Sequence, residues 1–552
     1  MSQAPTTSPG AFPTYYRLAS FLNILPPPLS EFIMMGLIGV DQAILKVLAW
    51  SIGSLIVGYA LKCLLSPSRR RFIYKKFAPI WTHNCFPRLS APRKSKVVFI
   101  SDPRALQEIL VKENGTVFTH APGHLEVNNL IFGPGLFGIS GATHKLQRSA
   151  LNPVFTTFHT KSKTSKMETV AHELTDAIVS AMDDADTREI NMLDWCKVTT
   201  LETIGYAGFG YAFGAIRGSQ SPYIEAMRNF IPIVAPLFGF KWYISWMYLV
   251  PRELWKKLIQ WAPSSYLQRL KKMIDIQTKY STDILESRKT MVSDSTEGEC
   301  DDILAALIRA NARARKEEML PDDQIKGQIN AFVFAGFETT SSSLARTIHT
   351  LAEHPHIQSQ LRAELLGTDP ELHDVDKLLY LDAVVRESLR LHPPVPTIER
   401  YASKDWVLPL RYATEDRKQE TYVKRGTKLL VSLGRANRCK ETWGEDADEF
   451  RPERWLAPLP RSVSKSKIPG MYSSMMTFSA GPRSCIGYKF AVLELKIILA
   501  RLVKTFQFAP GRQPVEWRAF GCMSPHVANK HEDGTIVLDE VPTLPVMVSI
   551  VQ

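Results

Sequence analysis

A cysteine near the C-terminal end of the sequence is surrounded by residues that suit an anionic sulfur ligand. Cys485 lies in FSAGPRSCIG, between Gly481 and Gly487. The missing side chains at these glycines let the backbone and a flat macrocycle come close to the sulfur. Arg483 can pair with a carboxylate of the macrocycle, Phe478 can cover the sulfur, and a helix starting near Gly487 would direct free N–H groups at it. We therefore predict a metal-binding thiolate, against the simpler alternative of a Gly-Pro turn that contains a buried cysteine.

A second segment that could do chemistry, AGFETT, lies inside a long apolar stretch with helical periodicity. A glycine inside a helix costs about 1 kcal/mol relative to alanine, so Gly336 needs a reason, and a macrocycle face packed against the helix would supply one. The Thr339 hydroxyl is expected to donate to a carbonyl of the preceding turn and to bend the helix. Glu338 would place a carboxyl group beside that bend. A polar stripe on a surface helix is the alternative interpretation of these residues.

Further motifs follow the same order along the chain as those of one enzyme family. HKLQR begins at His144, AGFETT begins at Ala335, the pair Glu387 and Arg390 lies in VVRESLRLHPP, and PERW precedes FSAGPRSCIG. Residues three apart on a helix share one face, so Glu387 and Arg390 can form an ion pair. Together these segments resemble the motifs of the cytochrome P450 family, and FSAGPRSCIG resembles its haem-binding signature Phe-x-x-Gly-x-Arg-x-Cys-x-Gly. The likeness runs from about residue 97 to the C-terminus.

The resemblance implies a haem b cofactor whose iron is bound by the Cys485 sulfur. The residues that would hold this cofactor are, by the same resemblance, His144, Arg148, Arg400, Phe478, Gly481, Arg483, Cys485 and Gly487. The arginines would bind the haem propionates. His144 stands where the family commonly has tryptophan, so an exposed helix position remains the alternative for this residue.

The resemblance also gives roles to the other motifs. Glu338 and Thr339 would relay protons during the activation of dioxygen. Glu387 and Arg390 would be buried and joined by Arg454 of PERW, so that the three residues hold the core on the haem side. The tryptophan of PERW replaces the usual phenylalanine and would keep its aromatic role.

A substrate pocket is expected between three parts of the chain. Its walls would come from residues 120–137, from the helix that carries AGFETT and from the segment that follows the Glu387 helix. The substrate residues expected there are Phe332, Ala335, Pro396, Thr397 and Ile398. Because this set is largely apolar, we expect a lipophilic small molecule. The resemblance to fungal members points to natural-product tailoring, with a terpenoid as one candidate.

The implied reaction inserts one oxygen atom of O₂ into the substrate with electrons from NADPH. The sequence contains no flavin or nicotinamide fingerprint, so a separate NADPH-cytochrome P450 reductase is expected as a partner. The net charge is +12, from 67 Lys and Arg against 55 Asp and Glu. Lys145, Lys489 and their neighbours could form a basic docking face for that reductase. We find no nucleic-acid module and no basic run interleaved with aromatic residues, so nucleic acid is not an expected partner.

Three other functions are compatible with parts of the sequence. A haem-thiolate isomerase or dehydratase would work without O₂, but such proteins tend to lose the acid–threonine pair, which Glu338 and Thr339 retain. A non-enzymatic haem sensor or electron carrier would not need that pair. A membrane protein without haem would leave the whole series of motifs unexplained.

The elements that would position these motifs are mainly helical. Apolar periodicity predicts helices over residues 143–156, 164–183, 194–209, 264–290, 323–354, 356–366, 378–391 and 488–505. Lys96 to Ser101 reads as a strand, Asp102-Pro103 as a helix start, and residues 395–435 as short strands and turns. The polar stretch from Arg288 to Cys300 reads as an exposed loop. We therefore predict a mainly α fold with a small β lobe, the cytochrome P450 fold.

The N-terminal part of the sequence predicts a membrane anchor. A helix over residues 43–65 would be long and apolar enough to cross a bilayer, and Arg69, Arg70 and Arg71 follow it. The positive-inside rule then gives a luminal segment 1–42, a basic linker 66–96 and a cytosolic catalytic domain 97–552 on the endoplasmic reticulum membrane. A cleaved signal peptide is disfavoured because the apolar run starts late and lacks a basic region before it. A buried core helix would not need the basic cluster. Seven scattered cysteines without a CxxC pair indicate a reducing compartment.

Overall fold

The structure is a computed structural model that describes residues 97–239, 260–261, 264–294, 302–367, 375–413, 417–530 and 535–551, except residues 122 and 184. The expected luminal segment, the anchor over 43–65 and the linker over 66–96 lie outside these residues. None of the helices within the described ranges combines the length and apolarity that crossing a bilayer requires.

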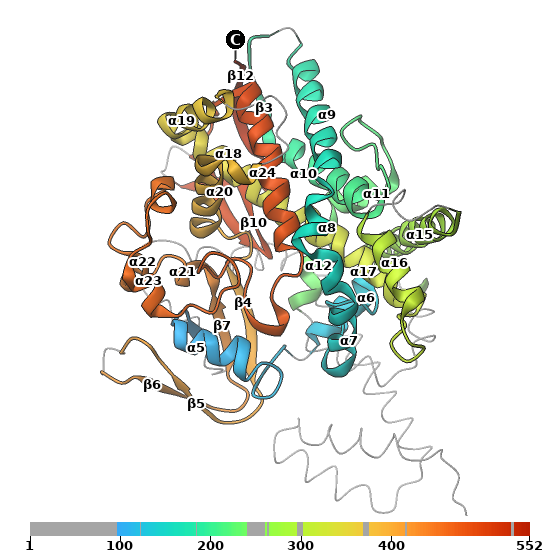
Figure 1. Ribbon diagram of the computed structural model, residues 1–552, viewed down its shortest axis with the longest axis vertical. Helices are drawn as coiled ribbons and strands as arrows, with labels where there is room; N and C mark the ends of the chain where they lie inside the picture. Colours follow the sequence, from blue (N-terminus) through green and yellow to red (C-terminus); the bar gives the residue numbers. More distant parts are fainter. Residues whose placement is uncertain are drawn as a thin grey trace, which may run out of the picture. The chain divides into compact units, whose positions relative to one another are not determined.

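Helices form most of the described chain, as predicted. The α-helices are α5 (Pro103–Gln107), α6 (His124–Phe132), α7 (Gly141–Leu151), α8 (Thr157–Lys161), α9 (Thr164–Met182), α10 (Met192–Thr203), α11 (Pro222–Arg228), α12 (Phe230–Gly239), α15 (Ser265–Asp294), α16 (Ile303–Arg313), α17 (Asp322–Ala335), α18 (Ser341–Glu353), α19 (Pro355–Leu366), α20 (Leu379–Leu391), α21 (Leu433–Ala436), α22 (Lys440–Trp443), α23 (Arg461–Ser466) and α24 (Tyr488–Thr505) (Figure 1). Three π-helical turns are η1 (Glu108–Lys112), η3 (Ile204–Gly208) and η5 (Gly336–Thr340). The 3₁₀ turns are η2 (Asn152–Phe155), η6 (Val375–Lys377), η7 (Pro452–Trp455) and η8 (Gly481–Arg483).

The strands are short and form four small sheets within the described ranges. They are β1 (Val97–Ile100), β2 (Phe118–Thr119), β3 (Thr187–Asn191), β4 (Thr397–Ala402), β5 (Trp406–Pro409), β6 (Glu420–Val423), β7 (Lys428–Ser432), β8 (Phe506–Pro510), β9 (Val515–Phe520), β10 (Cys522–Lys530), β11 (Ile536–Leu538) and β12 (Pro545–Ile550). The largest sheet has the strand order β1-β7-β4-β2, with β1 parallel to β7 and the other pairs antiparallel. The other sheets are β11-β10-β9, β3-β12-β8 and the hairpin β5-β6. The prediction of a mainly helical fold with a small β part is confirmed.

Local sequence explains where the first helix begins. Pro103 occupies the first turn of α5, where its missing N–H has no intrahelical role. The Asp102 side chain accepts hydrogen bonds from the N–H groups of Arg104 and Ala105, and so caps the helix. The same carboxylate accepts the N–H groups of Arg411 and Tyr412, which fixes the segment after β5 to this helix end.

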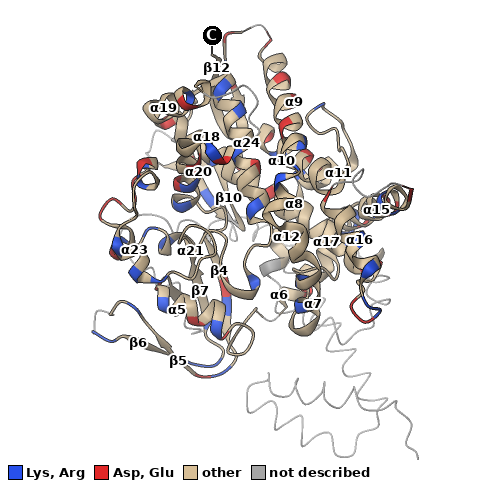
Figure 2. Ribbon diagram, in the orientation of Figure 1, with Lys and Arg blue, Asp and Glu red and all other residues tan. Residues whose placement is uncertain are grey.

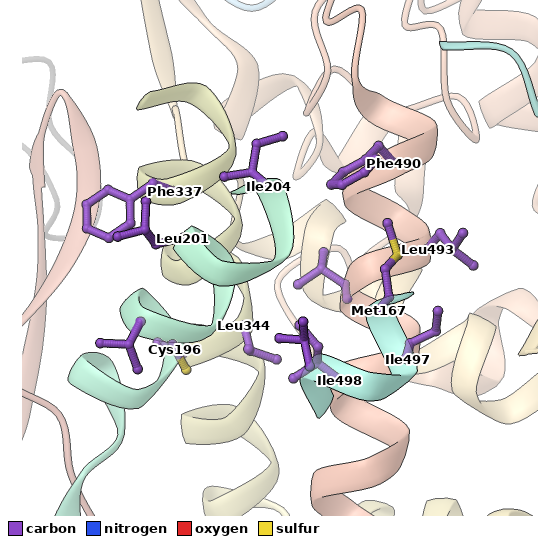
Figure 3. Close-up of a cluster of buried hydrophobic side chains, with 14 of the residues drawn as sticks. Met167, Cys196, Leu201, Ile204, Phe337, Leu344, Phe490, Leu493, Ile497 and Ile498 are labelled. Carbon is purple, nitrogen blue, oxygen red and sulfur yellow. The ribbon is translucent and has the colours of Figure 1, made fainter. Parts of the chain in front are cut away.

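The core lies between the long helices. Its larger hydrophobic cluster joins residues of α9, α10, α17, α18, α20 and α24, and a smaller cluster joins the β1-β7-β4-β2 sheet to α5 and η1. Most side chains of α24 are buried, which accounts for its apolar sequence. Figure 3 shows α10, the η5–α18 segment and α24 converging in this cluster, with Ile204, Phe337 and Phe490 among its members. Both signs of charge occur along α9 and α19 (Figure 2).

One local prediction is wrong. The loop predicted from Arg288 overlaps the end of the helix predicted over 264–290, and α15 continues beyond that helix to Asp294. Arg288 is buried there and forms an ion pair with Asp302, which caps α16 through the N–H of Ala305. The polar composition gave no sign of this helix end, because a buried ion pair rather than an apolar stripe attaches this part of α15 to the core.

Candidate active site

The loop that carries Cys485 is closed by backbone contacts. The Cys485 N–H donates to the carbonyl oxygen of Phe478 at 2.9 Å. Gly481 has a φ of 70°, and a Cβ at this position would collide with the Leu110 carbonyl of η1. Its glycine is therefore required by the close approach of η1, and the access for a macrocycle stays a prediction. At Gly487 a Cβ would meet only the Phe155 ring, at an ordinary 3.7 Å.

Cys485 is an exposed residue, although protein atoms lie close to its side chain. Burial raises the pKa of the Cys485 thiol, while the Gly487 N–H and the positive charge of Arg148 lower it. Gly487 directly precedes α24, so the N–H that faces the sulfur belongs to the start of that helix. Phe478 packs edge-on against Tyr472, with 5.6 Å between ring centres, and forms the aromatic base of the loop. The site therefore has an exposed cysteine and two groups that stabilise its anion.

Two of the arginines expected to bind propionates also hold the cysteine loop in place. Arg148 of α7 donates from Nη1 to the Ser484 carbonyl at 2.7 Å. Arg483 donates from its two terminal nitrogens to the carbonyls of Leu136 and Ile139, at 3.1 and 2.7 Å. These bonds tie the loop to α7 and to the segment before it. Each guanidinium has further N–H donors, so a role toward a carboxylate stays a prediction.

Basic side chains from distant parts of the chain gather beside this loop. Arg400, on β4, is 5% exposed, and burial followed by the charge of Arg483 lowers its pKa to about 10. His144, on α7, is buried rather than exposed, and burial lowers its pKa to about 4. His120, which the sequence interpretation did not single out, joins them through charge interactions with Arg400, Arg483 and His144. The alternative of an exposed helix position for His144 is therefore wrong.

These residues fit a haem. Among the described residues, the buried Nε atom of Arg400 and the buried Nε2 atom of His120 have no hydrogen-bond partner. A haem b offers an iron for the Cys485 thiolate and two propionates for basic donors of this kind. The Cys485 sulfur could therefore bind the iron, and the basic side chains could bind the propionates.

The AGFETT segment contains the predicted back-bond from Thr339 within an altered helical turn. The Thr339 hydroxyl donates to the Ala335 carbonyl at 2.7 Å, and residues 336–340 form the π-helical turn η5 between α17 and α18. Such turns recur at functional sites. A Cβ at Gly336 would lie 3.3 Å from side-chain carbons of Ile204, so this glycine permits close packing with η3. The predicted macrocycle contact stays a prediction.

Glu338 is buried in η5. Burial raises the pKa of its carboxyl group, and the positive charge of Lys197 on α10 opposes that shift. The same face of α10 is anchored to η5, because the Thr200 hydroxyl donates to the Phe337 carbonyl at 3.1 Å. Glu338 therefore retains its proton to a higher pH than a solvated glutamate does.

The residues expected to line a substrate pocket divide into two groups. Phe332 is buried and packs edge-on against Phe155, with 5.3 Å between ring centres, so the structure places it in the core. Its neighbour Phe334, which the sequence interpretation did not single out, lies 5.1 Å from the Phe132 ring and 4.6 Å from the Phe230 ring. The Phe334 cluster joins α17 to α6 and α12. The sequence pattern of α17 alone could not predict these contacts, because the partner rings come from distant segments.

The remaining candidates lie near the site's helices and sheet. Ala335 is partly buried and precedes Thr339 by four residues on one helix face. Pro396 is buried, and its carbonyl accepts the N–H of Leu433 at 2.9 Å. Thr397 and Ile398 are partly buried at the start of β4, the strand that carries Arg400.

The three residues expected to be structural form one buried network. Arg390 donates to Glu387 through two hydrogen bonds of 2.8 Å, and both side chains are fully buried. Arg454 donates to Glu387 at 3.3 Å and to Asp446 at 3.0 Å. The Trp455 indole N–H donates to the second oxygen of Glu387 at 2.9 Å. This tryptophan therefore adds a hydrogen bond that the usual phenylalanine could not make.

Comparisons with known proteins identify the family of this chain. A family model described as cytochrome P450 matches residues 73–527. Cytochrome P450 monooxygenase 91 of Postia placenta is 36% identical over 453 residues, covering 78% of this chain and 83% of its own length. A ganoderic acid synthetase of Ganoderma lucidum is 36% identical, covering 79% of this chain and 83% of its own length. A cytochrome P450 from Hericium erinaceus is 30% identical, with 80% and 85% covered.

The family match covers well over half of the chain, and it includes the Cys485 loop, η5 and the Glu387 network. The relatives align over more than two thirds of both sequences. The chain belongs to the cytochrome P450 family and is a P450 monooxygenase.

Proposed function

We propose that this enzyme inserts one atom of O₂ into a lipophilic natural product, with a terpenoid as the first candidate. Electrons come from NADPH through a separate NADPH-cytochrome P450 reductase that docks on a basic face including Lys145 and Lys489. The observation that carries the proposal is the exposed Cys485 together with an intact acid–threonine pair, Glu338 and Thr339, in the π-helical turn η5. An isomerase or dehydratase would not need that pair.

The chain's own residues supply charge and protons in this proposal. When bound, the haem supplies the iron at which dioxygen is activated. The Gly487 N–H and the Arg148 guanidinium stabilise the negative charge of the Cys485 sulfur. Glu338 holds a proton at a higher pH than usual because it is buried, which suits a group that delivers protons. The Thr339 hydroxyl, fixed by the Ala335 carbonyl, is the adjacent group that can pass a proton on.

The aromatic cluster supports a lipophilic substrate. Phe334 immediately precedes Ala335, and it contacts Phe132 and Phe230. Aromatic rings contribute large apolar area at low entropic cost, so a hydrocarbon skeleton is a suitable ligand beside them. The ganoderic acid synthetase that resembles this chain is named for a terpenoid product, which favours a terpenoid here.

We also propose that residues 43–65 anchor the enzyme to the endoplasmic reticulum membrane, with residues 1–42 in the lumen and the catalytic domain in the cytosol. The uncharged stretch 47–61 and the basic residues from Arg69 onward support this orientation. A membrane-bound enzyme would meet lipophilic substrates where they dissolve.

Oxygen incorporation tests the proposed reaction. Membranes that contain this chain and the reductase are incubated with NADPH, isotopically labelled O₂ and a panel of terpenoid precursors. We expect a product heavier by one labelled oxygen atom, formed only when NADPH is present. Cys485→Ser is the matched control and should give no product. A product formed without O₂ and NADPH would instead support the isomerase or dehydratase alternative.

A further inference from the structure

His120 lies near Arg400, one residue beyond the last pair of the β2–β4 ladder. It follows β2, which pairs antiparallel with β4 through Phe118 opposite Ala402 and Thr119 opposite Tyr401. One more step in this register brings His120 opposite Arg400. Side chains at directly opposite positions have Cβ atoms about 5 Å apart, so the two residues are neighbours.

This pair lies in an environment made of basic groups. Burial, followed by the charges of Arg400, His124, Arg483 and His144, lowers the pKa of His120 to about 2. The His120 ring stacks on His124, with 5.2 Å between ring centres and an interplanar angle of 1°. The stack fixes the plane of the imidazole, and α6, which begins at His124, carries the other ring.

Two buried nitrogen atoms in this cluster have no hydrogen-bond partner among the described residues. The Arg400 side chain is 95% buried and donates from Nη1 to the Glu399 carbonyl at 2.8 Å, but its Nε has no partner among the described residues. The same holds for Nε2 of His120. Buried donors without partners and adjacent like charges both destabilise a folded protein. A carboxylate between His120 and Arg400 would pair with both nitrogens and would offset the repulsion between the charges of Arg400 and Arg483.

We propose that His120 is a further haem-binding residue, which donates from Nε2 to a propionate carboxylate that it shares with Arg400. The His120–His124 stack orients the donor, and Arg400 supplies the permanent charge. This inference rests on haem as the cofactor of the family and is independent of the proposed substrate.

Haem release measures this contact without any assay of activity. His120→Phe keeps an aromatic ring for the stack and removes the donor. Transfer of haem from the holoenzyme to excess apomyoglobin, followed by the Soret absorbance, should be at least about tenfold faster in this variant, because a hydrogen bond to a charged group is lost. His172→Phe, on the exposed side of α9, is the matched control and should release haem at the wild-type rate.

A modified cofactor separates the proposed contact from a general loosening of the fold. Haem dimethyl ester lacks both propionate charges, so wild-type enzyme assembled with it should lose it faster than haem. With this ester, His120→Phe should cause no further acceleration, because the carboxylate partner is already absent. An equal acceleration with haem and with the ester, or unchanged release of haem by the variant, would overturn the proposal.

Discussion

Removing one N–H group from the Glu387 network should measurably destabilise the enzyme. Trp455→Phe keeps an aromatic ring in η7 but removes the indole nitrogen that donates to Glu387 at 2.9 Å. Glu387 is fully buried and also binds Arg390 and Arg454, so the carboxylate oxygen that loses this donor cannot turn to water. The variant thus tests a single charge-assisted hydrogen bond.

The expected size follows from the charge of the acceptor. Hydrogen bonds to charged groups contribute about 1.5–3 kcal/mol. Unfolding entropy is about 2.1 cal/mol/K per residue, so a domain of about 450 residues has about 1 kcal/mol per kelvin. The melting temperature of Trp455→Phe should therefore fall by about 1.5–3 °C relative to wild type.

Scanning calorimetry of the haem-bound enzymes at one fixed scan rate measures this difference. Trp443→Phe is a packing control, because Trp443 is buried and its indole nitrogen has no partner among the described residues. Trp261→Phe is a surface control, because Trp261 is 84% exposed. A melting temperature for Trp455→Phe that equals that of the Trp261→Phe control would refute the contribution of this hydrogen bond.

Three further perturbations test other parts of the account. Thr339→Ala should retain haem but consume NADPH while releasing hydrogen peroxide. The measurement is the ratio of oxygenated product formed to NADPH consumed. A ratio equal to that of wild type would contradict a proton-transfer role for the Thr339 hydroxyl, which donates to the Ala335 carbonyl. Burial raises the pKa of Glu494 well above its ordinary value. Between the unfolded-state pKa of about 4.3 and the raised pKa of the folded state, the folded enzyme binds an extra proton, so its stability falls as pH rises. Glu494→Gln should therefore gain stability over wild type as pH increases in urea titrations, and a constant difference would argue against the shift. Deleting residues 1–66 should move the enzyme from the membrane pellet to the supernatant with its haem spectrum unchanged, whereas persistent pelleting would point to a second attachment surface.

Local patterns predicted much of the fold because they depend on neighbours in sequence. The apolar periods over 164–183 and 488–505 correspond to α9 and α24, within one residue at each end. The back-bond from Thr339 to Ala335 was also predicted, since the two residues lie one turn apart. The motifs in AGFETT and FSAGPRSCIG therefore located both sides of the candidate site.

The remaining features depend on contacts between distant segments. Gly481 and Gly336 are explained by Leu110 and Ile204, which no local pattern connects to them. His120 becomes a candidate only because β2 pairs with β4 and brings it opposite Arg400. A single sequence contains no direct signal for such pairings. The two histidines four residues apart, the second of which begins α6, could nevertheless have prompted a search for a partner.

The Cys485 sulfur is the ligand that we expect on the haem iron. The most direct measurement is the spectrum of the reduced, CO-bound enzyme, recorded for wild type and Cys485→Ser. We predict a thiolate-type Soret band for wild type and its loss in the variant. A wild-type spectrum typical of an imidazole ligand, or a thiolate-type band that persists in Cys485→Ser, would contradict the assignment.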